Sequence, residues 1–220
     1  MEHKVKISVL MAVYNTDFYQ IKRAIDSVLG QSFQDFELIV IDDGSKNDPQ
    51  HRLLDYVKQH EGKITLLWHQ NRGQAQSINR GVSLARGEYI TILDADDEYG
   101  KDHLWRCLQE MQGSDLIAST TNTIVDHEGD YYVPDKHDQS QLVHVDDCIL
   151  FATLFGRKEV FDRVRFQEKY AADAQFYEHA ALQYRVKKVN LRTYVYYRNN
   201  PASTCAALKN KILASASGAL

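Results

Sequence analysis

The chain has 220 residues, 44% of them hydrophobic and 25% charged, which is the composition of an ordinary globular protein rather than a disordered one. Its 26 basic and 30 acidic residues give a net charge of −4, so no global positive field favours nucleic acid as a partner. The three cysteines are far apart, which fits a reducing compartment better than a disulfide framework. With no visible signal peptide and no apolar stretch of membrane-spanning length, we expect a cytoplasmic protein.

Strand and helix patterns alternate over the first hundred residues. A nearly continuous apolar run predicts a strand that is buried on both faces at Val5–Val13, and a second buried strand is predicted at Phe36–Ile41. Two further strands are predicted at Ile64–Trp68 and Tyr89–Leu93. Apolar residues with helical spacing predict a helix in each interval between these strands, and the second helix begins at Pro49. This order predicts an α/β fold with a mostly parallel central sheet and helices on both faces.

The second half of the chain has a less regular pattern. It predicts a helix around Leu104–Met111, strands at Leu116–Ser119 and Thr123–Val125, a hairpin turn at His127–Asp130, a helix at Gln175–Val186 and an edge or late strand at Val189–Tyr197. No linker separates the halves, so we expect a single domain over residues 1–220 with two subregions, 1–100 and 101–220.

Polar and acidic segments follow each of the first four predicted strands: Tyr14-Asn15, Asp42–Ser45, His69–Gly73 and Asp94–Asp97. In an open parallel sheet, ligands bind outside the carboxyl ends of the strands, so these segments converge on one edge. No P-loop and no dinucleotide-binding glycine fingerprint is present. The aspartates of the last segment suit Mg²⁺ or Mn²⁺, and the alternative, weighed equally, is a solvated loop with helix-capping aspartates.

Several segments occur together in a fixed order over residues 5 to 100: Ser8–Asn15, Ile41–Ser45, Asn71–Gly81, Ala85–Ile90 and Leu93–Asp97. This combination resembles family 2 glycosyltransferases of the GT-A fold. The resemblance implies an inverting, metal-dependent enzyme that moves a sugar from a nucleotide sugar, most often UDP-linked, to an acceptor hydroxyl. It also implies a role in polysaccharide or glycoconjugate synthesis, with residues 1–100 as the nucleotide-sugar-binding half and 101–220 as the acceptor-side half.

The resemblance assigns the donor-binding residues. The backbone near Ala12, together with Tyr14, would line the base pocket, Asp42 would hydrogen-bond the uracil ring, and Arg72 would contact base or diphosphate. Three of these assignments have an alternative: Asp42 accepts hydrogen bonds from the backbone amides of its turn, Tyr14 is a core residue, and Arg72 is a surface side chain. We expect His69 to be a surface or loop residue.

Asp94 and Asp96 occupy the family's DxD positions. The resemblance implies that Asp94 faces the ribose and that Asp96 ligates the metal, Mn²⁺ or Mg²⁺. We expect Asp97 to cap the next helix. The tyrosines Tyr194, Tyr196 and Tyr197 either line an acceptor groove or pack in the strand, and strand packing is favoured.

The family's catalytic base corresponds to Asp173, which follows Ala172 where an acidic neighbour is usual. The alternative for Asp173 is a helix cap or a first-turn carboxylate, and the two roles are compatible. Asn200 stands where a histidine often lies near the donor diphosphate. These replacements keep a second hypothesis open, a domain that binds a nucleotide sugar without catalysis.

A third hypothesis is a nucleotidyltransferase, which would need a basic, glycine-rich loop after the first strand, and residues 12–15 are not one. The expected partners are therefore a nucleotide-sugar donor and a carbohydrate or lipid-linked acceptor, with no nucleic acid. Peripheral contact with the inner face of a membrane and the oligomeric state stay open.

Overall fold

The computed structural model describes residues 5–47, 49–167 and 171–199. Its first part contains β1 (Ile7–Val13), α1 (Phe18–Leu29), β2 (Phe36–Asp42), α2 (Pro49–Lys58), β3 (Ile64–Trp68), α3 (Gln74–Leu84), β4 (Tyr89–Ile92), β5 (Glu98–Tyr99) and α4 (His103–Glu110). The second part contains β6 (Leu116–Ile124), β7 (Tyr132–Pro134), β8 (Leu142–His144), β9 (Leu154–Arg157), α5 (Lys158–Val164), α6 (Ala172–Ala181) and β10 (Val186–Tyr197).

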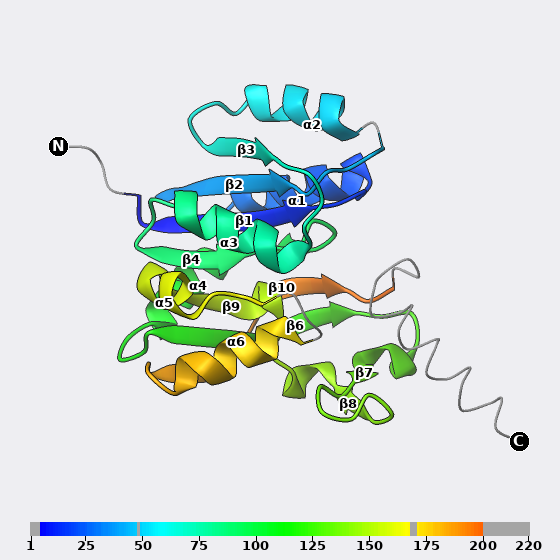
Figure 1. The fold of residues 1–220 in the computed structure, drawn as a ribbon, viewed down its shortest axis with the longest axis vertical. Coiled ribbons are helices and arrows are strands. Elements are labelled where there is room, and N and C mark those ends of the chain that lie inside the picture. The colour runs from blue at the N-terminus through cyan, green and yellow to red at the C-terminus, as the bar shows by residue number, and fades with distance from the viewer. Residues whose placement is uncertain (1–4, 48, 168–170, 200–220) are drawn as a thin grey trace, which may run out of the picture.

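A central eight-stranded sheet has the order β3-β2-β1-β4-β9-β6-β10-β5 and so includes strands from both halves of the chain (Figure 1). The pairs β1–β2, β1–β4, β2–β3 and β6–β10 are parallel, whereas β9 pairs antiparallel with β4 and β6, and β5 pairs antiparallel with β10. The two remaining strands, β7 and β8, form a separate ribbon. The predicted mostly parallel α/β sheet is confirmed.

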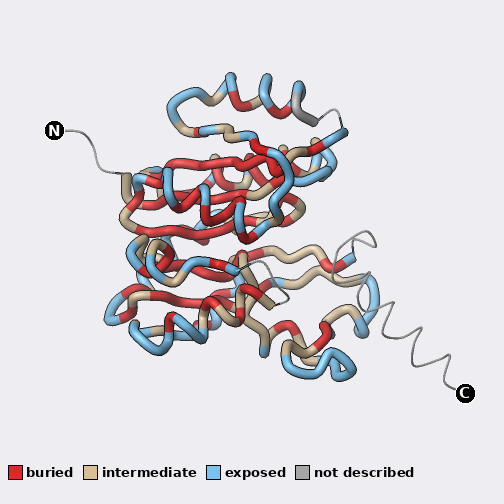
Figure 2. The backbone as a smooth tube through the Cα atoms, viewed as in Figure 1, coloured by how far each residue is buried: buried red, intermediate tan, exposed pale blue. Residues whose placement is uncertain are grey.

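Helices cover both faces of this sheet. The apolar sides of α1, α2 and α4 pack on one face, and those of α3, α5 and α6 pack on the other. Figure 2 shows the consequence: buried residues run along the central strands, and exposed residues lie on the outer helix faces and loops. Burial on both faces explains why β1 and β2 are nearly uninterrupted apolar runs rather than alternating patterns.

The strands and helices predicted for the first hundred residues are all present, but three predictions for the second half are wrong. The two strands predicted between residues 116 and 125 are one strand, β6, because its polar middle pairs with β10 on either side of an irregularity between Val189 and Tyr194. The predicted hairpin turn is a short 3₁₀ helix, Glu128–Tyr131, closed by the Asp130 amide donating to the His127 carbonyl.

The third wrong prediction concerns the bounds of the helix predicted at Gln175–Val186, since a helix is present there but spans Ala172–Ala181. The helix α6 ends at Ala181, and β10 already begins at Val186. The residues from Val186 to Val189 pair with β6, so Val186 is the first residue of a strand and not the last residue of a helix. The final strand is therefore longer than predicted, and it lies between β6 and the short edge strand β5.

Candidate functional site

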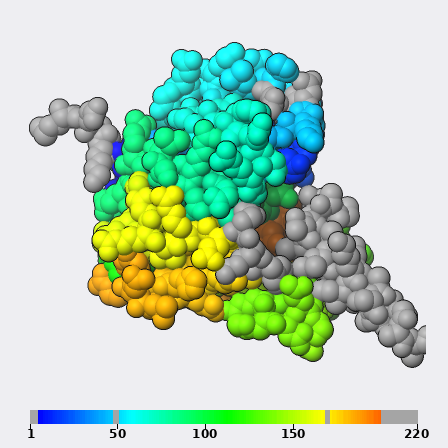
Figure 3. All heavy atoms as spheres, viewed as in Figure 1, coloured from blue at the N-terminus to red at the C-terminus, as the bar shows by residue number. Residues whose placement is uncertain are grey.

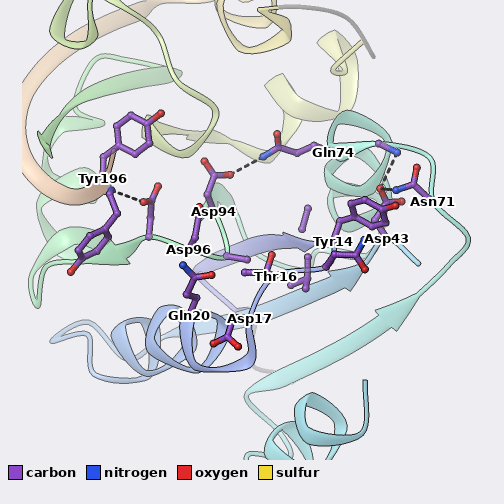
Figure 4. A pocket seen from close by; sticks show the side chains of 17 residues that line it. Tyr14, Thr16, Asp17, Gln20, Asp43, Asn71, Gln74, Asp94, Asp96 and Tyr196 are labelled. Atoms are coloured by element: carbon purple, nitrogen blue, oxygen red, sulfur yellow. Dashed lines mark hydrogen bonds between the residues drawn. The ribbon is translucent and has the colours of Figure 1, made fainter. Parts of the chain in front are cut away.

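A cavity of about 640 Å³ opens at the carboxyl ends of β1, β2 and β4. Its lining residues come from five chain segments: residues 12–17 with Gln20, Asp43, residues 71–74 except Arg72, residues 94–97, and Tyr196 with Tyr197. In Figure 4, Asp94 and Asp96 lie between Tyr196 on one side and Tyr14 with Asp43 on the other. The edge predicted from the sequence is thus the edge that holds the cavity.

The end of β1 forms one wall of this cavity. Ala12 and Tyr14 both line it, and Tyr14 is 48% exposed, so it is not a core residue. Asn15 has a left-handed backbone with φ 52°, and its side-chain oxygen accepts from the Lys46 amide at 2.8 Å. The Asn15 amide in turn donates to the Ser45 hydroxyl at 3.0 Å, so the turn after β2 is fixed against the end of β1.

Asp42 and Asp43 have different environments. Asp42 is the last residue of β2, and its buried carboxylate accepts from the Ser45 amide at 2.8 Å, the turn contact that the sequence left as the alternative. Asp43 lines the cavity and accepts from the Asn71 side chain at 3.1 Å and from the amides of Arg72 and Gly73 at 2.8 and 2.9 Å. The resemblance named Asp42 for the base pocket and gave Asp43 no role.

Gly44 allows the turn after β2 to approach the loop after β3. Its φ is +78°, and a Cβ there would lie 2.7 Å from the backbone nitrogen of Asn71. His69 lies in this loop, one of the two positions predicted for it, but not at the surface. Its ring is buried, with Nε2 at 3.1 Å from the Ser77 hydroxyl and 3.6 Å from Asp43. Arg72 is exposed and lines a second, smaller cavity rather than the main one.

The segment after β4 contributes the acidic residues. Asp94 accepts from the Gln74 amide group at 2.7 Å (Figure 4), so the start of α3 holds this carboxylate in the cavity. Asp96 also lines the cavity. Burial raises the pKa of Asp94 to about 7, and the nearby charges of Asp96 and Asp173 add to the rise.

Asp97 is not a helix cap as predicted. It is buried and accepts from the Tyr194 hydroxyl at 2.6 Å and from the Tyr197 amide at 2.8 Å, whereas α4 begins several residues later, after Asp102. These bonds attach the acidic segment to β10. They also show which of the two predicted roles each tyrosine has: Tyr194 packs in the strand, whereas Tyr197 lines the cavity.

Arg23 is a further residue that the sequence did not indicate, because a charged residue on a helix is common. From α1, its guanidinium donates to the backbone carbonyl of Asp96 and lies 3.2 Å from the Glu98 carboxylate. It also stacks over the ring of Tyr197, 4.0 Å from the ring centroid. One cation thus fixes the acidic segment and the end of β10 together.

Asp173 lies in the first turn of α6 and accepts from the amides of Ala174 and Phe151 at 2.8 and 3.1 Å. It is not among the residues that line the 640 Å³ cavity, but its charge contributes to the raised pKa of Asp94. Burial raises the pKa of Asp173 itself to about 6, although its two backbone hydrogen bonds act in the opposite direction. Asn200 lies outside the described residues.

The residues of the cavity fit a divalent cation in part. Among the described residues, no group of three His, Cys, Asp or Glu side chains could hold a metal. Mg²⁺ and similar ions are, however, commonly held by one or two carboxylates with substrate phosphates and water. Asp94 and Asp96 supply such a pair, and their mutual repulsion, visible in the raised pKa of Asp94, is what a cation would relieve.

The comparison with protein families decides the family. A model of glycosyl transferase family 2 matches residues 8–189. The chain belongs to this family. The family 2 glycosyltransferase resemblance predicted from the sequence segments is therefore confirmed, and the matched region contains the lining residues of the cavity other than Tyr196 and Tyr197, together with Asp173.

Curated relatives match this family 2 chain over about half its length. An uncharacterized glycosyltransferase of Nostoc sp. is 36% identical over 52% of this chain and 35% of its own. GlyG of Streptococcus pneumoniae is 32% identical over 57% and 42%, and the Escherichia coli chondroitin synthase is 34% identical over 56% and 18%. The chain thus spans less than half the length of these relatives.

Solved structures confirm the GT-A fold of this family 2 chain. Staphylococcus aureus TarS (residues 1–349), in complex with UDP-GlcNAc, superposes with a TM-score of 0.69 at 20% identity, over 92% of this chain and 60% of its own. The mannosyltransferase PcManGT of Pyrobaculum calidifontis, in complex with GDP-Man and Mn²⁺, gives 0.73 at 17% identity, over 99% and 65%. Within the described residues, no helix has the length and apolarity needed to cross a membrane.

Proposed function

We propose that this chain transfers a sugar from a nucleotide diphosphate sugar to an acceptor hydroxyl, with inversion and with the help of a divalent cation. The observation that carries the proposal is the cavity at the carboxyl edge of the sheet, in which Asp94 and Asp96 lie beside Tyr14 and Asp43. Family 2 membership and the nucleotide sugars named in the TarS and PcManGT complexes support the same function.

The nucleoside is proposed to bind between the ends of β1 and β2, with uridine as the expected base. Ala12 and Tyr14 line this end of the cavity, and Tyr14 offers an exposed ring on which a base can stack. A carboxylate is needed to accept the N3–H of uracil. We assign this role to Asp43, because it lines the cavity, whereas Asp42, which is equally buried, does not line it and accepts from the Ser45 amide.

The diphosphate is proposed to lie against Asp94 and Asp96, which would hold Mn²⁺ or Mg²⁺ together with phosphate oxygens. When bound, the cation stabilises the negative charge of the leaving nucleoside diphosphate. Two other side chains position these carboxylates. Gln74 orients the Asp94 carboxylate, and Arg23 fixes the segment that carries Asp96.

Asp173 is proposed as the base that accepts the proton of the acceptor hydroxyl. Its carboxylate is oriented by the amides of Ala174 and Phe151, so it combines the first-turn role with the catalytic one. A pKa of about 6 suits the task, because the group is ionised at neutral pH and more basic than an ordinary aspartate. The acceptor is proposed to be a carbohydrate or a lipid-linked carbohydrate, in polysaccharide or glycoconjugate synthesis.

Calorimetric titration of UDP, GDP and UDP-sugars, with and without Mn²⁺, tests the proposal. Tight Mn²⁺-dependent binding of UDP or a UDP-sugar is expected, followed by slow metal-dependent hydrolysis of the bound nucleotide sugar. GDP binding in place of UDP would correct the base. Binding without hydrolysis or transfer would favour a non-catalytic nucleotide-sugar domain, and no nucleotide binding at all would refute the proposal.

A further inference from the structure

A second cavity, of about 210 Å³, lies on the outer side of α3, away from the sheet. Its lining includes three arginines, Arg72 and Arg80 from the α3 region and Arg165 from the segment that follows α5. Figure 3 shows this face of the molecule, on which α3 lies next to α5, and α5 next to α6. We call this the α3 basic cavity.

The three arginines are exposed, and none of them forms an ion pair with a carboxylate in the part of the chain that the structure describes. Other arginines of the chain do lie within 4 Å of a carboxylate: Arg23, Arg86, Arg157, Arg163, Arg185 and Arg192. In a chain of net charge −4, this convergence of unneutralised guanidinium groups on one hollow is a local exception.

The walls of the α3 basic cavity are held in place. The Asn79 side chain donates to the Phe166 carbonyl at 2.8 Å and accepts from the Phe166 amide at 3.0 Å, which joins α3 to the segment after α5. Arg165 donates to the Ser83 hydroxyl at 3.3 Å, and Arg80 donates to the Trp68 carbonyl at 3.2 Å. Each of these arginines keeps further N–H groups for a ligand, because a guanidinium has five.

We propose that the α3 basic cavity is an anion site that binds a phosphate group, separate from the donor cavity. Arginine forks match the oxygens of a phosphate and make strong, charge-assisted hydrogen bonds with it. The loop of residues 69–73 separates the two cavities, since Asn71 and Gly73 line the larger one and His69 and Arg72 the smaller one. The phosphate belongs either to a soluble phosphorylated compound or to the headgroup of an anionic lipid.

The test measures phosphate binding and not sugar transfer, so it is independent of the proposed function. Inorganic phosphate is titrated by calorimetry into the full chain in a chelating buffer, because without a cation the acidic donor cavity repels phosphate. The double variant Arg80→Gln with Arg165→Gln is expected to bind at least about tenfold more weakly than the parent. The control, Arg106→Gln with Arg163→Gln, removes the same charge from exposed arginines outside this cavity and is expected to match the parent.

A second arm distinguishes the two sources of phosphate. The parent and both double variants are sedimented with phosphatidylglycerol vesicles and with phosphatidylcholine vesicles, and thermal melting confirms that each variant is folded. Binding to phosphatidylglycerol that depends on Arg80 and Arg165 identifies a lipid headgroup, and binding of free phosphate alone identifies a soluble compound. If neither probe binds, or if both double variants bind like the parent, the proposal is overturned.

Discussion

Replacing Asp173 by asparagine separates its catalytic role from its structural one. The parent carboxylate lies in the first turn of α6, and burial there raises its pKa from 3.8 to about 6. At about 1.4 kcal/mol for each pKa unit, the charged form costs the folded state about 3 kcal/mol at pH 8. Since the folded pKa is raised, the parent loses this stability as the pH rises from about 4 through 6 and keeps it below 4.

The asparagine side chain is uncharged, nearly isosteric with aspartate and caps helices about as well. It has one acceptor oxygen, whereas the amides of Ala174 and Phe151 donate to different oxygens of Asp173, so the variant loses one of these bonds at every pH. The stability of Asp173→Asn relative to the parent is therefore expected to rise by up to about 3 kcal/mol between pH 4 and pH 8. Urea denaturation at the two pH values measures this difference. A variant that loses stability relative to the parent between pH 4 and pH 8 would mean that the charge stabilises the fold through the helix dipole, against this reasoning.

Catalysis is expected to respond in the opposite direction. Loss of a general base lowers the rate by about 10²–10⁴-fold, so single-turnover transfer by Asp173→Asn should fall by that factor while UDP affinity stays at the parental value. Glu178→Gln is the matched control, because Glu178 lies on the same helix but is paired with Lys136 at the surface. Near-parental transfer by Asp173→Asn would refute the assignment, and loss of transfer in Glu178→Gln alone would move the role of base to Glu178.

Three further predictions concern the donor site and the fold. Asp96→Ala is expected to abolish the effect of Mn²⁺ on UDP affinity without unfolding the chain, and equal calorimetric titrations with and without Mn²⁺ in parent and variant would contradict the metal assignment. Asp43→Asn is expected to weaken UDP binding by about ten- to a hundredfold, which corresponds to the free energy of a charge-assisted hydrogen bond. Asp42→Asn keeps its turn contact and is expected to bind UDP like the parent. The reverse order of affinities would return the role to Asp42. The pKa of Asp115 is lowered to about 2, and hydrogen bonds from Arg185 are the largest cause of this shift. The stability that this pair supplies is therefore present above about pH 4 and is lost as the pH falls towards 2. Urea midpoints of the parent and Asp115→Asn should therefore converge between pH 5 and pH 2, and a constant difference would rule out this pair as the cause.

The sequence by itself determined the fold class and the edge of the sheet at which the site lies. Strands that are buried on both faces have nearly continuous apolar sequences, so β1, β2 and β4 could be predicted from local pattern alone. The edge strand β3 was also predicted from its apolar run, although Thr65 and Trp68 are exposed in it. Ligands of such sheets bind at the carboxyl ends of the strands, so Tyr14, Asp94 and Asp96 could be predicted as neighbours from their positions after successive strands.

The tertiary structure decided the features that depend on contacts between distant segments. The polar middle of β6 is a strand only because β10 pairs with it, and Asp97 is a buried acceptor only because β10 brings Tyr194 to it. Whether Asp42 or Asp43 reaches the cavity depends on one residue of strand length, which sheet pairing sets and local pattern does not. The α3 basic cavity likewise exists only because the Asn79 side chain joins α3 to a segment 87 residues away, a separation at which sequence patterns carry no information.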